Sequence, residues 1–204
     1  MRIRWRGFEL PTRVAVDRET ATENYGKFYA EPFERGYGHT IGNSLRRVLL
    51  SSLEGAAVTW VKIDGVSHEF TAIPGCREDT TEVVLNLKQL LVAVDGSGEQ
   101  VLKIEKSGEG PVTGADVQTN EKVTIVNPDH TICELTSKGK FSAEIGVRKG
   151  RGYVTAEELS AAAGDAVLGT IPIDASFSPV RRVRYATENA RVGQRTDYDR
   201  LVLE

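Results

Sequence analysis

The first feature that could carry chemistry is a run of glycines before a predicted helix. Residues 36–42 read Gly-Tyr-Gly-His-Thr-Ile-Gly, and Asp64 follows Gly42 after 22 residues. In a dinucleotide-binding fingerprint, such glycines let the backbone approach a pyrophosphate and the acidic residue binds a ribose. Here the third glycine comes one residue late and no buried strand precedes the run. Glycines that allow a tight entry into a helix are therefore the favoured interpretation, and a nucleotide-dependent enzyme using residues 36–42 is the alternative.

The cysteines and histidines are scattered along the chain. Cys76 and Cys133 have no second ligand at metal-site spacing, and His39, His68 and His130 lie far apart in sequence. The sequence signatures of serine hydrolases, zinc proteases and P-loop enzymes do not occur. We therefore expect no metal, no cofactor and no catalytic residue, and we expect the two cysteines to be free thiols in a reducing, cytoplasmic compartment.

Two arginine-rich segments, residues 148–151 and 181–184, could contact a nucleic acid. Binding of this kind requires a sustained positive surface, whereas the chain as a whole carries 26 Lys and Arg against 29 Asp and Glu. Solvated strand faces or protein contacts are the favoured interpretation of both segments. An RNA-binding module is a second alternative.

Residues 39–54 have the clearest helical pattern in the chain. Thr40 is a candidate N-cap, and Gly55 is placed to end the helix. Spacing of three and four residues puts one apolar set on a single face: Ile41, Leu45, Val48 and Leu49. The other side carries Asn43, Arg46, Arg47 and Leu50. From periodicity alone, that side is either a solvated charged surface with one incidental leucine or the surface of an interface helix.

The remaining elements are mostly short strands. Residues 57–63 and 66–70 flank the turn signal Asp64-Gly65 and predict a hairpin in which His68 and Phe70 face inward. A second helix is predicted over residues 79–90, capped by Asp79. Its apolar stripe consists of Val83, Val84, Leu87, Leu90 and Leu91. Further strands are expected at residues 100–106, 123–126, 131–135, 141–149 and 180–187, and from Tyr198 onward. Residues 156–169 are expected to form a loop with one helical turn at 156–162.

The chain has 204 residues, which is enough for one domain or two small ones. Its net charge is about +3 over residues 1–53, −8 over 54–176 and +2 over 177–204, an asymmetry that can mark separate structural units. The longest apolar run, residues 90–94, is far too short to span a membrane, and no secretory signal is recognisable. Many short strands with few helices predict an α+β fold with mostly antiparallel sheets and two main helices.

Residues 31–52, EPFERGYGHTIGNSLRRVLLSS, closely resemble the signature helix of the bacterial DNA-directed RNA polymerase alpha subunit family. Further matches follow in the same order along the chain: residues 63–70, 78–88, 110–113, 151–154, 177–180 and 191–197. The resemblance covers almost the whole chain.

The resemblance implies an amino-terminal domain with a second subdomain inserted into the first. Residues 1–54 and 177–204 would form the dimerisation and assembly subdomain, and residues 55–176 the insert that faces the large subunits. The implied function is a non-catalytic, cytoplasmic scaffold in transcription, which pairs with a second alpha subunit and recruits beta and then beta-prime to a nucleotidyltransferase complex. Family members continue into a last dimerisation helix, a linker and a DNA-binding domain. The resemblance therefore implies a chain cut before that helix, without direct nucleic-acid contact.

The resemblance also assigns individual residues. Beta contacts would come from Asn43, Arg46, Arg47, Leu50, Glu69, Glu78, Asp79 and Glu82, within a surface that includes residues 76–82. Beta-prime contacts would come from Lys88, Ser178, Pro179 and Val180, and dimer contacts from Ile41, Leu45, Val48 and Leu49. Arg47 matches the arginine on which beta binding depends in the family. The donor fork of a guanidinium suits carboxylates or carbonyls across an interface.

Overall fold

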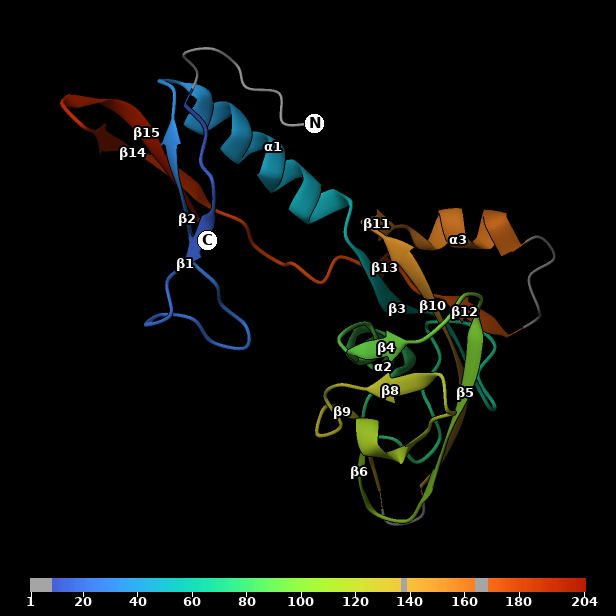
Figure 1. Ribbon diagram of the computed structural model, residues 1–204. Helices are drawn as coiled ribbons and strands as arrows, with labels where there is room; N and C mark the ends of the chain where they lie inside the picture. The colour runs from blue at the N-terminus through green and yellow to red at the C-terminus, as the bar shows by residue number, and fades with distance from the viewer. Residues whose placement is uncertain (1–8, 137–138, 164–168) are drawn as a thin grey trace. The chain divides into compact units, whose positions relative to one another are not determined.

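The computed structural model describes residues 9–136, 139–163 and 169–204, apart from the side chains of residues 162 and 163. The chain divides into two compact units: unit 1 comprises residues 1–53 and 180–204, and unit 2 comprises residues 54–179 (Figure 1). The described part contains three α-helices and a larger share of strands, which pair antiparallel. The predicted α+β class with antiparallel sheets is confirmed.

Unit 1 is built on one sheet that joins the two ends of the chain. Its strands are β1 (Val14–Val16), β2 (Phe28–Phe33), β14 (Tyr185–Val192) and β15 (Arg195–Leu203), in the order β1-β2-β15-β14. Strand β15 pairs with β2 on one side and with β14 on the other. The sheet therefore needs residues from both ends of the chain in order to form. Gly193, with φ 62°, forms the turn between β14 and β15. The strand predicted at residues 180–187 lies further along the chain, as β14 at Tyr185–Val192. The last strand, expected from Tyr198 onward, begins three residues earlier at Arg195.

Helix α1 (Tyr37–Ser51) packs on β14 and β15 (Figure 1). It begins before the expected N-cap Thr40, because the carboxylate of Asp199 in β15 accepts hydrogen bonds from the backbone N–H groups of Gly36, at 2.8 Å, and Gly38, at 3.3 Å. The N-terminal residue of the helix is thus capped from the neighbouring sheet rather than by a local side chain. The predicted helix end at Gly55 is also wrong, because α1 ends at Ser51 and Gly55 lies in the following strand.

Replacing Asp199 by alanine should lower the free energy of unfolding by about 1 kcal/mol, because two N–H groups at the positive end of the α1 dipole lose their acceptor. Urea unfolding followed by circular dichroism measures the change. Asp197 in the same strand pairs with exposed Arg195 and caps no helix, so Asp197→Ala is the matched control with a smaller expected effect. Equal losses in the two variants would contradict a cap by Asp199.

Close contact between α1 and its sheet depends on small residues. Gly38 and Gly42 are the buried residues of α1, and Ile41 packs against Ala30, Phe33 and Leu201. A Cβ atom at Gly42 would lie 2.5 Å from Cδ2 of Tyr185 and 2.8 Å from Cδ1 of Leu201. The helix therefore lies nearer to the sheet than any larger residue at this position would allow.

Unit 2 contains a five-stranded sheet with the order β12-β3-β10-β5-β7. Its strands are β3 (Glu54–Ile63), β5 (Gln100–Ser107), β7 (Val117–Gln118), β10 (Lys140–Arg151) and β12 (Thr170–Pro172). Three smaller pairs complete the unit: β4 (Val92–Val94) with β8 (Val123–Ile125), β6 (Gly110–Thr113) with β9 (Thr131–Leu135), and β11 (Tyr153–Val154) with β13 (Ala175–Ser176). The short 3-10 helix η1 (Gly114–Asp116) follows β6. The core includes Val61, Leu87, Ile104, Phe141 and Ile145, each with no exposed surface.

The predicted hairpin at residues 57–70 is wrong. The first expected strand lies in β3, but β3 pairs with β10 on one side and with β12 on the other. Because both edges of β3 are occupied, residues 66–70 have no free edge to pair with and form a loop after the turn at Gly65. His68 and Phe70 are consequently exposed rather than directed inward.

The second predicted helix is confirmed as α2 (Thr80–Lys88), with the side chain of Asp79 accepting a hydrogen bond from the backbone N–H of Glu82 at 2.8 Å. Val83, Leu87 and Leu90 are buried as expected, whereas Leu91 is 43% exposed. Residues 156–163 form a regular helix, α3 (Ala156–Ala163), instead of a loop with one turn. The rest of that predicted loop, residues 164–168, lies outside the described residues.

Among the helices of the described chain, none is both long and apolar enough to cross a membrane.

Candidate functional site

The exposed side of α1 carries the two arginines singled out from the sequence. Asn43, Arg46 and Arg47 are exposed, and Leu50 is half-buried. Within residues 9–136, 139–163 and 169–204, neither guanidinium forms a hydrogen bond or an ion pair. Since α1 is packed on the sheet through other residues, the two exposed guanidinium groups present ten N–H donors, five each.

The apolar residues of α1 are divided between two environments. Ile41 packs on the sheet of its own unit, and Leu49 is half-buried. Leu45 is 39% exposed and Val48 is 50% exposed. The four residues predicted for dimer contacts thus include two that the sheet leaves uncovered.

The acidic residues predicted for beta contacts lie around the start of α2 and differ in role. Asp79 caps the helix, and Glu78 accepts a hydrogen bond from the backbone N–H of Glu134 at 2.8 Å. Glu69 and Glu82 are exposed, and the hydroxyl of Thr81 donates to the backbone carbonyl of Glu69 at 2.9 Å. The loop at Glu69 and the first turn of α2 are therefore brought together, with Glu78 and Asp79 holding local structure.

Lys88, predicted for beta-prime contacts, forms an ion pair within unit 2. Its Nζ lies 3.1 Å from Oδ2 of Asp174 and 3.4 Å from the hydroxyl of Tyr153. The other carboxylate oxygen of Asp174 accepts a hydrogen bond from the backbone N–H of Ala156 at 2.8 Å, at the start of α3. That hydrogen bond, together with those from Tyr153 and Lys88, holds the pKa of Asp174 below its usual value. Lys88 therefore connects α2 to the segment that positions α3.

The other residues predicted for beta-prime contacts lie in the segment between β13 and β14. Pro179 is exposed, whereas Ser178 and Val180 are half-buried. The segment has no regular secondary structure from residue 177 to residue 184.

The structure brings together two cysteines that the sequence leaves 57 positions apart. Cys133 is fully buried in the core of unit 2, and Cys76 is half-buried beside it. Burial raises the pKa of both thiols, and the two side chains interact with each other. Both are free, as predicted, and the described residues contain no group of three side chains suited to a metal ion. Spacing in the sequence gave no signal of this proximity.

The glycine run does not provide a nucleotide site. The N–H groups of Gly36 and Gly38 at the start of α1 donate to Asp199, and Gly38 and Gly42 pack against side chains of β14 and β15. A phosphate would have to displace a carboxylate of the same chain. The nucleotide-dependent alternative is therefore not favoured.

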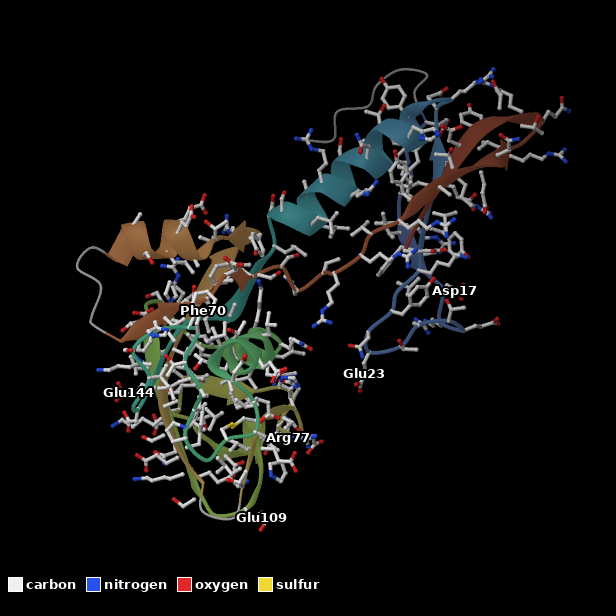
Figure 2. The ribbon with its side chains drawn as sticks, turned by 180° about the vertical axis from the view of Figure 1, so that it is seen from behind. Asp17, Glu23, Phe70, Arg77, Glu109 and Glu144 are labelled. Atoms are coloured by element: carbon white, nitrogen blue, oxygen red, sulfur yellow. The ribbon has the colours of Figure 1, made fainter. Side chains whose placement is uncertain are left out.

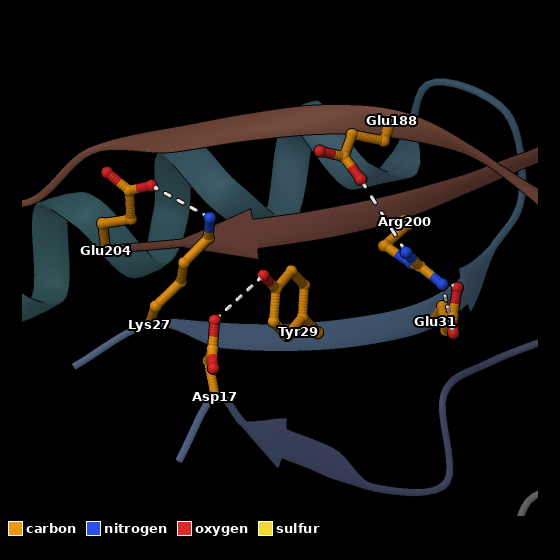
Figure 3. Close-up of polar contacts among 7 residues, drawn as sticks. All are labelled: Asp17, Lys27, Tyr29, Glu31, Glu188, Arg200 and Glu204. Atoms are coloured by element: carbon orange, nitrogen blue, oxygen red, sulfur yellow. Dashed lines mark hydrogen bonds and ion pairs between the residues drawn. The ribbon is translucent and has the colours of Figure 1, made fainter. Parts of the chain in front are cut away.

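The sheet of unit 1 carries a network of charged side chains on the face opposite α1. Tyr29 and Glu31 alternate with the core residue Ala30, so they point away from the helix (Figure 3). Arg200 donates two hydrogen bonds to Glu31, at 2.6 and 2.9 Å, which hold the pKa of Glu31 below its usual value. Lys27 pairs with Glu204 at 3.7 Å. The basic residues of this face are neutralised by carboxylates, which does not favour nucleic-acid binding there.

The chain is similar in sequence to known proteins. Residues 61–178 match the model of the RNA polymerase Rpb3/RpoA insert domain, which defines most of unit 2 as an RNA polymerase insert domain. The chain is 57% identical to the DNA-directed RNA polymerase subunit alpha of Rhodopirellula baltica over 204 residues, which are all of this chain and 61% of that protein. It is 51% identical to the subunit of the same name from Syntrophomonas wolfei over 192 residues, 94% of this chain and 60% of that protein.

The chain belongs to the family of DNA-directed RNA polymerase alpha subunits. It spans about 60% of the length of these relatives.

Proposed function

We propose that the chain is a non-catalytic assembly scaffold of a bacterial RNA polymerase in the cytoplasm. It pairs with a second copy and binds the beta subunit and then beta-prime, whose own residues perform nucleotidyl transfer. Family membership and the names of the relatives support this role. No catalytic residue, cofactor or nucleic-acid contact is assigned to the chain.

The observation that carries the proposal is the exposed arginine pair on α1. Helix α1 packs through Gly38, Ile41 and Gly42, and Arg46 and Arg47 are exposed without an ion pair among the described residues. Arginine is favoured at protein interfaces because its planar donor fork recognises carboxylates and carbonyls. Asn43 and Leu50 extend the surface with a hydrogen-bonding group and an apolar side chain. We assign this surface to beta.

Pairing with a second copy is assigned to the apolar side chains of α1. Leu45 and Val48 are exposed in the single chain, and their burial against a partner would be favourable by about 25 cal/mol per Å² of apolar surface. Ile41 and Leu49 continue the same stripe and are partly covered within unit 1. Contact with beta-prime is assigned to Lys88 and to residues 178–180.

Ordered assembly provides the test. A tagged chain is mixed with purified beta, with beta-prime, or with beta followed by beta-prime, and the captured proteins are quantified. The scaffold role predicts capture of beta alone and capture of beta-prime only once beta is bound. Equal capture of beta-prime with and without beta would contradict the order, and failure to capture either subunit would contradict the scaffold role.

A further inference from the structure

Two aspartates in the sequence are followed directly by glycine, in the pairs Asp64-Gly65 and Asp95-Gly96. At such a pair, the backbone nitrogen of the glycine can attack the side-chain carboxyl carbon of the aspartate, because glycine has no side chain to shield that nitrogen. The attack closes a five-membered succinimide ring. It requires a carboxyl group that can rotate to within about 3–3.5 Å of the nitrogen. The two pairs should therefore differ in reactivity if the fold holds one carboxyl group and leaves the other free.

The carboxyl group of Asp64 is held by the neighbouring strand. Its Oδ2 atom accepts a hydrogen bond from the hydroxyl of Ser142 at 2.6 Å, and the backbone N–H of Asp64 donates to the carbonyl of Ser142 at 2.9 Å. Ser142 lies in β10, two residues before Glu144, whose side chain is labelled in Figure 2. The backbone N–H of Val66 donates to the carbonyl of Ile63 at 3.2 Å, so this Asp-Gly pair lies at the centre of a hydrogen-bonded turn between two buried residues. Attack on this carboxyl group would first break its hydrogen bond with Ser142.

The carboxyl group of Asp95 is in a different environment. Asp95 is exposed directly after β4, and within residues 9–136, 139–163 and 169–204 its side chain makes no hydrogen bond or ion pair. Its backbone N–H donates to the carbonyl of Lys122 at 2.7 Å, next to the last pair between β4 and β8. Residues 96–98 then form a bend in which Gly96 and Gly98 have φ values of 86° and 95° and open space around them. The side chain of Asp95 can therefore rotate towards the next nitrogen without losing a contact.

We propose that Asp95 is a site of spontaneous isoaspartate formation in the folded chain, and that Ser142 protects Asp64 from the same reaction. In the first step, the nitrogen of Gly96 forms a bond to Cγ of Asp95, a Cγ–O bond breaks, and the protonated oxygen leaves with the amide hydrogen as one water molecule. In the second step, one water molecule adds to the ring. Addition at the main-chain carbonyl carbon gives isoaspartate, and addition at Cγ restores aspartate. The two steps together leave the composition of the chain unchanged.

Isoaspartate at position 95 would lengthen the main chain by one methylene group between β4 and β5 and place a free α-carboxylate on the loop. Residues 95–99 are all exposed. The product would thus be accessible to a methyltransferase that recognises isoaspartyl carboxylates and uses S-adenosylmethionine as the methyl donor. This inference goes beyond the proposed scaffold function and does not depend on it, because it concerns the chemistry of one loop.

The test incubates the full chain at neutral pH and physiological temperature and then digests it with trypsin. Peptides 63–77 and 89–103 each contain one Asp-Gly pair and no other aspartate. Isoaspartate in each peptide is quantified by chromatography with mass spectrometry and by methylation with a purified isoaspartyl methyltransferase. We expect about tenfold more isoaspartate at residue 95 than at residue 64, because only the carboxyl group of residue 64 must give up a hydrogen bond. Similar amounts in the two peptides, or more in peptide 63–77, would overturn the proposal.

Two variants and one change of conditions test the cause of the difference. Ser142→Ala, with its folding checked by circular dichroism, should raise isoaspartate at residue 64 about tenfold and leave residue 95 unchanged. Asp95→Glu should abolish the product in peptide 89–103, because the longer side chain would have to close a six-membered ring. In wild type unfolded by urea, the two pairs should react at similar rates. A difference that persists in urea, or a folded Ser142→Ala chain with no increase at residue 64, would contradict protection by the fold.

Discussion

Gly42→Ala should lower the free energy of unfolding by about 1–3 kcal/mol, although alanine is the better helix former. In a solvated helix, the same replacement would raise stability by up to about 1 kcal/mol. Here the added Cβ would lie 2.5 Å from Cδ2 of Tyr185 and 2.8 Å from Cδ1 of Leu201. These atoms belong to packed side chains on the sheet, so α1 or the sheet must shift. A lower free energy of unfolding would therefore show that the steric cost of the added Cβ exceeds the gain in helix propensity, and a higher one would show the reverse.

The free energies of unfolding of Gly42→Ala and Ser44→Ala are measured by urea unfolding and compared with that of wild type. Ser44 is exposed on the same helix, and its hydroxyl donates to the carbonyl of Thr40 at 2.9 Å, so its replacement should change stability by no more than about 0.5 kcal/mol. A stabilised Gly42→Ala variant would contradict the close packing of α1. A shift of α1 would also displace the exposed arginines, so we expect the Gly42 variant to bind beta more weakly than the Ser44 variant.

The elements that could be predicted from the sequence are those whose signals are local. Asp79 and the apolar spacing after it specify α2, and alternating β-forming residues between turn signals specify β9 at Thr131–Leu135. The exposure of Arg46 and Arg47 also followed from helical periodicity, because the phase of the helix is fixed by its own residues. Each of these features depends on residues within the same element.

The features that the sequence could not predict depend on contacts between distant segments. The cap of α1 joins Gly36 to Asp199 across 163 positions. Local spacing favoured Thr40 for that role. Strand β3 pairs with β10 and β12, neither of which follows it directly, and this non-local pairing converts the expected second hairpin strand into the exposed loop of Phe70.

In the candidate site too, residue types were predictable from the sequence, whereas the contacts of their side chains were not. The acidic residues predicted for beta contacts differ in role, because Glu78 and Asp79 accept hydrogen bonds from backbone N–H groups of their own unit, while Glu69 and Glu82 are exposed. Lys88 is tied to Asp174, which in turn positions the start of α3. Proximity of this kind is set by the sheet topology, and residue type alone gives no indication of it.

Arg47→Ala should leave the fold intact and weaken beta binding about 100-fold, the size of effect expected when a central interface arginine is removed. The side chain makes no hydrogen bond or ion pair among the described residues, and the hydrogen bond that the Ser51 hydroxyl donates to the backbone carbonyl of residue 47, at 2.7 Å, does not involve that side chain. Truncation therefore removes no known support from α1. It removes five donors from the surface assigned to beta.

The decisive measurement is the affinity of purified beta for wild type, Arg47→Ala and Arg18→Ala, with circular dichroism confirming equal folding. Arg18 is exposed in unit 1 but lies outside α1, so it controls for the loss of one positive charge. The scaffold account predicts a dissociation constant about 100-fold higher for Arg47→Ala and within about twofold of wild type for Arg18→Ala. Equal affinities for all three chains would contradict it.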